Sequence, residues 1–187
     1  AGSVILTTGT FLNGKIYIGN EKISAGRIKE QASNSLGLFL QSLELQMARL
    51  KTGTPPRLNK KSIDFSCLEK DIGDIAPDFF STTTKKITNK QLPCFVTWTN
   101  LNTHDIIKKS LKSSPLYNGT ISSSGPRYCP SIEDKIQRFY DKHKHRIMLE
   151  PEGLNSDIIY PNGISTSLPL TVQKKIINSI RGLEKAV

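Results

Sequence analysis

The chain has 187 residues, enough to bury a hydrophobic core in one domain or in two small ones. A hydrophobic content of 36% and a charged content of 22% are typical of a soluble globular protein and argue against a disordered chain. No apolar run approaches the ~20 residues that cross a bilayer, so we expect no membrane partner. The net charge of +10 allows a polyanionic partner such as RNA, although charge alone slightly favours a lysine-rich solvated surface.

The first 50 residues contain signals for strands and one helix. Residues 4–8 form a short apolar, β-prone run that ends at Gly9, and residues 15–19 predict a second strand. Ser33 or Ser35 then stands where it could cap a helix, and a helix N-terminus is also an anion site. Apolar residues at three- and four-residue spacing predict that this helix buries one stripe: Leu36, Phe39, Leu40, Leu43, Met47 and Leu50.

A cationic loop follows at residues 49–57, punctuated by Gly53 and by the pair Pro55-Pro56. Backbone amides and basic side chains in such a loop could hold phosphate. A rigid loop that crosses between domains is an equally good interpretation, and the two prolines make a plausible boundary.

Residues 57–124 are predicted to form a separate mixed unit. It contains a strand start at 62–65, a polar loop over 71–90, an alternating strand over 92–99 and a short helix that opens at 103–105. Cys94 lies on one face of the alternating strand, so we interpret it as a packed core residue and not as a nucleophile.

The sequence Gly-Pro-Arg-Tyr-Cys-Pro-Ser-Ile-Glu-Asp-Lys at 125–135 predicts a turn followed by a capped amphipathic helix. Ser131 and Asp134 resemble a capping box. Cys129 stands just ahead of the helix N-terminus and two residues after Arg127, a setting that lowers a thiol pKa and favours the nucleophilic thiolate. A small buried cysteine beside a capped helix is the alternative, and from these residues alone the more frequent one.

The last segment predicts a strand at 147–149 and a polar turn at 150–153. General acid/base chemistry is conceivable for its two carboxylates, but a polar turn is the simpler interpretation. A Pro-Asn-Gly turn at 161–163 predicts a hairpin between strands at 158–160 and 164–167. Thr171 is expected to cap a final helix and Gly182 to end it.

Histidine and cysteine spacing predicts no metal site and no disulfide framework, and it favours a reducing cytoplasm. His104 is expected to cap or pack near a helix start. His143 and His145 stand at i and i+2, so they face different sides of a helix and are expected in a solvated charged end. The remaining chemistry-bearing residues are three widely spaced cysteines: Cys67, Cys94 and Cys129.

Five stretches, in the same order, resemble the GidA/MnmG family, and together they cover nearly the whole chain. They are Thr-Thr-Gly-Thr-Phe-Leu-Asn-Gly at 7–14, Arg-Leu-Lys-Thr-Gly-Thr-Pro-Pro-Arg at 49–57, residues 125–139, Glu-Pro-Glu-Gly-Leu at 150–154 and Tyr-Pro-Asn-Gly-Ile-Ser-Thr-Ser-Leu-Pro at 160–169. Because the family's proteins are much longer, the resemblance indicates an internal fragment.

The resemblance implies a fold of class α/β to α+β, part of a Rossmann-like FAD-binding domain with an inserted mixed α/β domain. Segments 1–56 and 125–187 would belong to the FAD-binding domain and 57–124 to the insertion. Members of the family bind FAD, use NADH and act as cytoplasmic homodimers with the GTPase MnmE. They add a (carboxymethyl)aminomethyl group to C5 of the wobble uridine of tRNA, with a folate-derived one-carbon donor.

The resemblance also implies site residues. Cys129 would be the catalytic thiol that attacks the uracil ring, and Arg127 and Lys135 would neutralise phosphate or the thiolate. The cofactor-binding residues would be Ser33, Gly125, Pro126, Arg127, Tyr128, Cys129, Pro130, Ser131, Ile132, Glu133, Asp134, Lys135, Ile136, Gln137, Arg138 and Phe139.

One departure from the family pattern limits what this chain is expected to do alone. The Gly-x-Gly-x-x-Gly loop that anchors FAD in such proteins is absent from the sequence. We therefore expect the chain by itself to bind FAD poorly and to be inactive. Two other functions remain open: a folate- and FAD-dependent tRNA uridine methyltransferase, and a basic RNA-binding module without chemistry.

Overall fold

The computed structural model describes residues 1–123, 125 and 129–187, and the chain divides into two compact units. Unit 1 comprises Ala1–Thr52, Leu111–Cys129 and Ser167–Leu170, and unit 2 comprises Gly53–Ser110, Pro130–Thr166 and Thr171–Val187. The first crossing, after Thr52, lies close to the boundary predicted at Pro55-Pro56. It therefore supports the interpretation of this loop as a connection between units.

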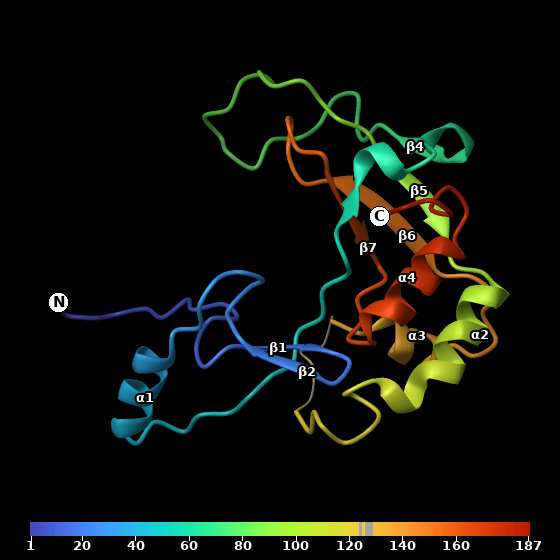
Figure 1. Ribbon diagram of the computed structural model, residues 1–187. Coiled ribbons are helices and arrows are strands. Elements are labelled where there is room, and N and C mark those ends of the chain that lie inside the picture. Colours follow the sequence, from blue (N-terminus) through green and yellow to red (C-terminus); the bar gives the residue numbers. More distant parts are fainter. Residues whose placement is uncertain (124, 126–128) are drawn as a thin grey trace. The chain divides into compact units, whose positions relative to one another are not determined.

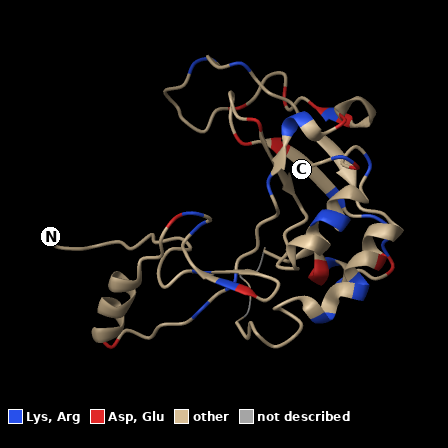
Figure 2. Ribbon diagram, in the orientation of Figure 1, with Lys and Arg blue, Asp and Glu red and all other residues tan. Residues whose placement is uncertain are grey.

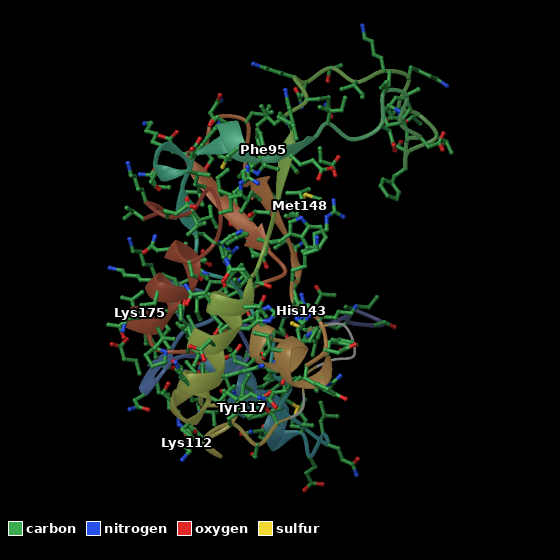
Figure 3. All side chains as sticks on the ribbon, turned by 90° about the vertical axis from the view of Figure 1, so that its right-hand side faces the viewer. Phe95, Lys112, Tyr117, His143, Met148 and Lys175 are labelled. Atoms are coloured by element: carbon green, nitrogen blue, oxygen red, sulfur yellow. The ribbon has the colours of Figure 1, made fainter. Side chains whose placement is uncertain are left out.

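Unit 2 is built on a five-stranded antiparallel sheet in the order β3-β7-β6-β5-β4 (Figure 1). The strands are β3 (Leu58–Asn59), β4 (Glu69–Asp71), β5 (Cys94–Trp98), β6 (Arg146–Pro151) and β7 (Ile158–Asn162). β6 is central, and Phe95 and Met148 lie on neighbouring strands (Figure 3).

The pairing of β5 with β6 joins the predicted insertion, 57–124, to the segment that follows it. The compact units therefore do not follow the predicted division between 124 and 125, because a sheet ties together strands that are far apart in sequence. Which segments belong to a flavin domain and which to an insertion stays a prediction.

Three helices accompany this sheet: α2 (Leu101–Ser110), α3 (Ile132–Arg138) and α4 (Leu170–Asn178) (Figure 1). α2 and α3 contact each other. The core of unit 2 consists of almost fully buried aliphatic side chains, namely Ile107, Ile132, Ile136, Ile147, Leu149, Ile159, Ile164, Ile176, Ile180 and Leu183. Burial of each such side chain contributes about 1.5–3 kcal/mol, so this cluster holds helices and sheet together.

Unit 1 contains an antiparallel hairpin of β1 (Lys15–Ile18) and β2 (Glu21–Ser24) and the helix α1 (Asn34–Ser42). The hairpin turns at Gly19, which has a φ of 56° and donates its N–H to the Ser167 carbonyl at 2.7 Å. A Cβ at this position would lie 2.7 Å from Cγ of Pro169, so both backbone and space require glycine.

The prediction for the N-terminal segment is partly wrong. β1 confirms the strand at 15–19, but residues 4–8 form no strand, and Val4 and Ile5 are 77% and 87% exposed. The helix is shorter than its apolar pattern because the chain turns at Glu44, which adopts a left-handed φ of 57°. Of the predicted buried stripe, only Leu40 is buried.

Three further expectations are corrected. The strand start at 62–65 is instead two one-turn 3₁₀ helices, η1 (Lys60–Ser62) and η2 (Phe65–Cys67); a third, η3 (Leu111–Ser113), follows α2. The hairpin around 161–163 is wrong, because β7 pairs with β6 and β3 and residues 164–167 form no strand. α4 starts at Leu170 and ends at Asn178, ahead of Gly182, which occupies the next turn with a φ of 80°.

The other main expectations are confirmed, including the strands at 92–99 and 147–149, the capped helix after Ser131 and the mixed α/β class. Lys and Arg occur on segments throughout the chain (Figure 2). Among the helices of the described residues, none is long and apolar enough to span a bilayer.

Candidate functional site

The helix α3 carries most of the predicted site and begins with a complete capping box. Ser131 Oγ accepts from the backbone N–H of Asp134 at 3.1 Å, and Asp134 Oδ2 accepts from the N–H of Ser131 at 3.1 Å. These two contacts satisfy N–H groups that the first turn of a helix leaves without an intrahelical acceptor. Both side chains therefore hold the helix start in place.

The rest of α3 is hydrogen-bonded to residues 163–166, which follow β7. The N–H of Ile132 donates to the Ser165 carbonyl at 2.8 Å. Glu133 is fully buried, and its Oε1 accepts from the Thr166 hydroxyl at 3.0 Å. Lys135 Nζ donates to the Gly163 carbonyl at 2.8 Å, and burial lowers the pKa of this lysine. The charged residues of the motif thus anchor α3 within unit 2.

These contacts sort the predicted cofactor-binding residues by accessibility. Ser131, Ile132, Glu133 and Ile136 are buried, and Asp134 and Lys135 are half-buried. Exposed residues of the motif are Pro130, Gln137, Arg138 and Phe139. Pro126, Arg127 and Tyr128 lie outside the described residues. The exposed residues are the ones whose side chains could reach a ligand without repacking the core.

Cys129 belongs to unit 1, where it is half-buried and forms no disulfide with the other described cysteines. Lys51 Nζ donates to the Cys129 carbonyl at 3.5 Å, and Lys51 Cε lies 3.2 Å from where a Cβ of Gly125 would stand. Lys51 of the cationic loop therefore brings positive charge to the Gly125 and Cys129 backbone. By contrast, burial raises the pKa of the Cys94 thiol, with smaller contributions from Glu150 and Asp71, which disfavours the thiolate there.

Ser33 occupies the N-cap of α1, as expected, but its side chain makes no capping hydrogen bond. The first turn of α1 also contains no acidic residue. N–H groups at the start of a helix and the positive end of its dipole attract anions. This helix start has the donors that a phosphate-bearing cofactor needs, whereas the side chains of Ser131 and Asp134 are used by their own capping box.

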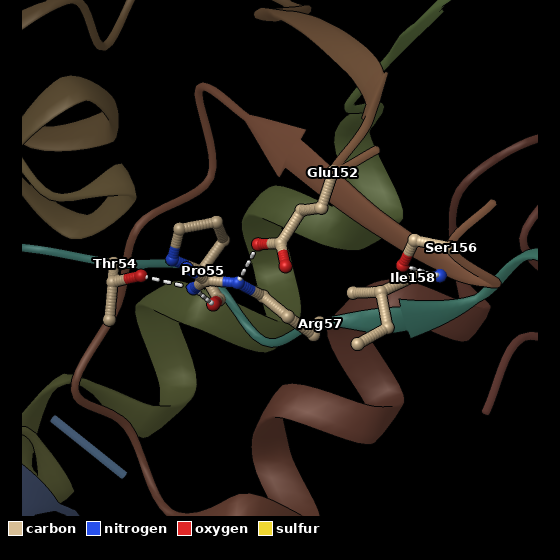
Figure 4. A network of polar contacts seen from close by, with 6 residues as sticks. All are labelled: Thr54, Pro55, Arg57, Glu152, Ser156 and Ile158. Atoms are coloured by element: carbon tan, nitrogen blue, oxygen red, sulfur yellow. Dashed lines mark hydrogen bonds and ion pairs between the residues drawn. The ribbon is translucent and has the colours of Figure 1, made fainter. Parts of the chain in front are cut away.

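The basic residues at the two ends of the cationic loop have protein partners. Arg49 Nη2 donates to the Asn13 carbonyl at 3.1 Å in unit 1. In unit 2, Arg57 donates to Glu152 Oε1 at 2.6 Å, to the Thr54 hydroxyl and to the Pro55 carbonyl at 3.0 Å (Figure 4). These contacts favour the structural interpretation of the loop over phosphate binding.

The polar turn at 150–153 is likewise engaged in structural contacts. Glu152 pairs with Arg57, whose guanidinium carbon lies 4.5 Å from the ring centroid of Tyr160. Glu150 Oε1 accepts from Asn162 Nδ2 at 2.9 Å. Glu150 thus links β6 to β7, and Glu152 links the turn after β6 to Arg57, so both carboxylates are engaged in structural contacts.

His104 and His145 form a buried pair of rings, and the sequence did not predict the burial of His145. His104 Nε2 lies 2.7 Å from the Thr99 hydroxyl, and the rings of His104 and His145 are 5.3 Å apart. His145 is buried, contrary to the expectation of a solvated end, although His143 is exposed as expected. The period-2 pattern of His145, Ile147 and Leu149, all buried, is the signal that could have placed this ring inward.

Among the described residues, no group of three or more His, Cys, Asp or Glu side chains could hold a metal ion. His104 is buried, hydrogen-bonded to the Thr99 hydroxyl and packed beside His145, which agrees with the expectation of a packing residue. The features that remain as candidates for chemistry are the Cys129 thiol, the N-terminus of α1 and Lys51.

Comparisons with known proteins identify the family. The family model described as glucose inhibited division protein A matches residues 1–187. A curated relative from Buchnera aphidicola subsp. Cinara cedri, named tRNA uridine 5-carboxymethylaminomethyl modification enzyme MnmG, is 56% identical over 184 residues, 98% of this chain and 29% of its own length. The protein of the same name from Thermodesulfovibrio yellowstonii is 54% identical over 186 residues, 100% of this chain and 30% of its own.

A solved structure of Aquifex aeolicus GidA, from the form I crystal, is similar with a TM-score of 0.85 and 50% identity. The match covers 97% of this chain and 31% of the GidA chain, so the sequence spans about a third or less of these relatives. High identity and a shared fold over almost every residue are together decisive: the chain belongs to the family of glucose inhibited division protein A.

Proposed function

We propose that this chain is part of a flavoenzyme that uses FAD and NADH to modify C5 of the wobble uridine of tRNA. The observation that carries the proposal is the identity of 54–56% to relatives named tRNA uridine 5-carboxymethylaminomethyl modification enzyme MnmG. Because the chain spans about 30% of those relatives, the activity is proposed for the protein as a whole.

FAD and NADH carry phosphate groups, and one helix start fits such a group. At the N-terminus of α1, Ser33 has a hydroxyl that makes no capping hydrogen bond, and the first turn carries no opposing carboxylate. FAD bound there would supply redox chemistry. On α3, exposed Gln137, Arg138 and Phe139 are the motif residues best placed to contact a cofactor.

Cys129 is the residue we propose as the nucleophile. Addition of its thiolate to carbon 6 of the uracil ring would make carbon 5 electron-rich and ready to form a bond to an incoming one-carbon unit. Lys51 places a cation at the Cys129 backbone, where its ammonium donates to the Cys129 carbonyl. Lys135 is less suited to neutralising the thiolate, because its ammonium already donates to Gly163.

The family resemblance supports the remaining partners of the proposal. They are tRNA as substrate, the GTPase MnmE, a folate-derived one-carbon donor and a second copy of the protein, all in the cytoplasm. The basic composition, with a net charge of +10, suits an RNA substrate. A folate- and FAD-dependent tRNA uridine methyltransferase is the alternative enzyme, and it differs in leaving a plain methyl group on C5.

Mass spectrometry of tRNA nucleosides from a strain that lacks the gene tests the proposal. We expect the (carboxymethyl)aminomethyl uridine to disappear and to return with the wild-type gene. Cys129→Ser should fail to restore it while tRNA binding persists. Cys67→Ser is the matched control, since Cys67 is also half-buried and outside any disulfide among the described residues, and it should restore the nucleoside.

Other results would redirect or reject the proposal. Loss of a C5-methylated uridine in its place would establish the methyltransferase. Full restoration by Cys129→Ser would reject the nucleophile, and an unchanged nucleoside profile in the deletion strain would reject the enzyme altogether.

A further inference from the structure

A group of exposed aromatic rings and lysines lies where β5 ends and the chain returns from α3 into β6. The rings of Trp98, Phe139 and Tyr140 are exposed by 39%, 46% and 80%. Lys142 and Lys144 follow Tyr140 closely in sequence and are exposed. We call these five residues the aromatic–lysine surface. Of the five, only Phe139 belongs to the motif that is proposed to contact a cofactor.

The lysines of the aromatic–lysine surface lie against its rings. Lys144 Nζ is 4.6 Å from the ring centroid of Trp98, and Lys142 Nζ is 5.0 Å from that of Phe139. His143, also exposed, lies in the same connection (Figure 3).

The backbone beneath the surface is fixed on both sides. The N–H of Thr99 donates to the His145 carbonyl at 3.0 Å, and the N–H of His145 donates to the Thr99 hydroxyl at 2.8 Å. Trp98 is paired with Arg146 in the ladder between β5 and β6. Since His145 is buried, its neighbours Lys144 and Arg146 are turned outward. The rings and cations are thus arranged before any partner arrives.

The charge of this region is positive. Segment 139–146 contains Lys142, Lys144 and Arg146 against one carboxylate, Asp141. Arg146 also faces Asp71 at 3.5 Å, but both of these side chains are well exposed, so solvent screens the pair. Lys142 and Lys144 are exposed, so both can meet an anionic partner.

We infer that the aromatic–lysine surface binds unpaired nucleotides of the tRNA substrate, an inference that rests on the proposed function. Unpaired bases stack on exposed aromatic rings, and lysines beside those rings neutralise the adjoining phosphates. An acidic protein would engage the lysines but would leave three exposed rings without a matching face. Single-stranded RNA would engage both the rings, through its bases, and the lysines, through its phosphates, so it is the partner that we infer.

The chain's single tryptophan makes the inference directly measurable, because Trp98 is then the only source of indole emission. Titrating the protein with an unmodified tRNA transcript should quench that emission as a base stacks on the ring. Lys142→Gln combined with Lys144→Gln should weaken tRNA binding about fivefold or more. It should also lower the slope of log K against log salt by about 1.4–1.8, at 0.7–0.9 per phosphate contact.

Two further variants separate stacking from charge. Tyr140→Ala, at a side chain 80% exposed, should weaken binding about fivefold without disturbing the fold. Lys174→Gln combined with Lys175→Gln on α4 removes the same charge from exposed positions, with Lys175 well away from His143 (Figure 3), and should leave binding and slope unchanged. Circular dichroism checks that each variant is folded.

The inference is overturned if tRNA binds without changing Trp98 emission, or if the two double-lysine variants weaken binding equally. Equal quenching by polyglutamate would assign the surface to an acidic protein instead. These outcomes are independent of the nucleoside assay. Selective quenching together with an unchanged nucleoside profile would keep the RNA surface and reject the enzyme, whereas the reverse pattern would keep the enzyme and reject the surface.

Discussion

His104 and His145 are buried rings in a setting that favours their neutral forms. Burial lowers the pKa of His104 from its ordinary 6.5, and the neighbouring His145 and Lys108 lower it further. Burial likewise lowers the pKa of His145, with smaller contributions from Lys135 and Lys142. Among the described residues, Nε2 of His145 has no hydrogen-bond partner. A charged His145 would therefore carry an N–H at Nε2 without an acceptor.

We predict that this pair makes the fold sensitive to mild acid. As the pH falls below 6.5, the unfolded chain protonates both histidines while the native state keeps them neutral. Unfolding therefore takes up protons and the free energy of unfolding decreases, by up to about 1.4 kcal/mol per pH unit for each histidine. Above 6.5 the stability that the pair contributes is fully present.

Urea unfolding between about pH 7.5 and 5 measures the effect. His104→Gln keeps a polar partner for Thr99 and should flatten the pH dependence, whereas His143→Gln, at an exposed position, should leave it as in the wild type. Identical pH profiles for wild type and His104→Gln would contradict the prediction.

At the scale of single residues, sequence predicted those whose role is local. Ser131 and Asp134 were predicted as a capping box because two residue types at a spacing of three suffice to define it. The burial of Glu133 and the anchoring of Lys135 to Gly163 could not be foreseen, since both depend on a segment about 30 residues away. The role of Cys129 was inferred from family resemblance, and it stays a prediction.

At the scale of elements, the capping box of α3 is expected to contribute measurably to stability. Ser131→Ala removes an acceptor for the N–H of Asp134 at a position that is 1% exposed, so water cannot readily replace it. We expect the free energy of unfolding to fall by about 1 kcal/mol, within the 0.5–2 typical of an N-cap. Urea denaturation measures it, with the exposed Ser122→Ala as control. Equal stability of the two variants would show that the cap is dispensable.

Two elements with strong local periodicity in unit 2 were predicted correctly, whereas the hairpin, which depends on strand pairing, was not. The alternation over 92–99 corresponds to β5, and the apolar spacing after Ser131 corresponds to α3. The turn signal at 161–163 was misleading because Pro161 lies inside β7, opposite Leu149. β3 pairs only with Ile158 and Ile159, so the missing N–H of Pro161 falls beyond that short ladder and is tolerated.

For the whole molecule, composition gave the broad class but not the division into units. The units are discontinuous in sequence, because β5 and β6 pair across nearly 50 residues. Unit 1 also exposes apolar side chains that an amphipathic pattern places inside, including Leu36, Phe39 and Leu43. Periodicity shows which face of a helix is apolar, but it does not show whether the same chain covers that face.

The last prediction concerns the affinity of the 187-residue chain for FAD. The sequence contains no Gly-x-Gly-x-x-Gly loop, whose backbone N–H groups hold a dinucleotide pyrophosphate. In its absence, we expect the N-terminus of α1 to attract the phosphates. Losing two charge-assisted hydrogen bonds of about 1.5–3 kcal/mol each weakens binding about 100-fold or more. We therefore expect a Kd above about 100 µM, measured from the flavin absorbance and fluorescence during titration.

The variants Ser33→Ala and Ser35→Ala locate whatever binding remains. Ser33 is the N-cap of α1, whereas Ser35 is exposed one residue inside the helix, so a phosphate held at the helix start should be sensitive to the first change and not to the second. Tight, stoichiometric uptake of FAD by the wild-type chain would contradict the prediction. It would mean that other groups in this chain replace the missing loop, and Ser33→Ala would then show whether α1 is among them.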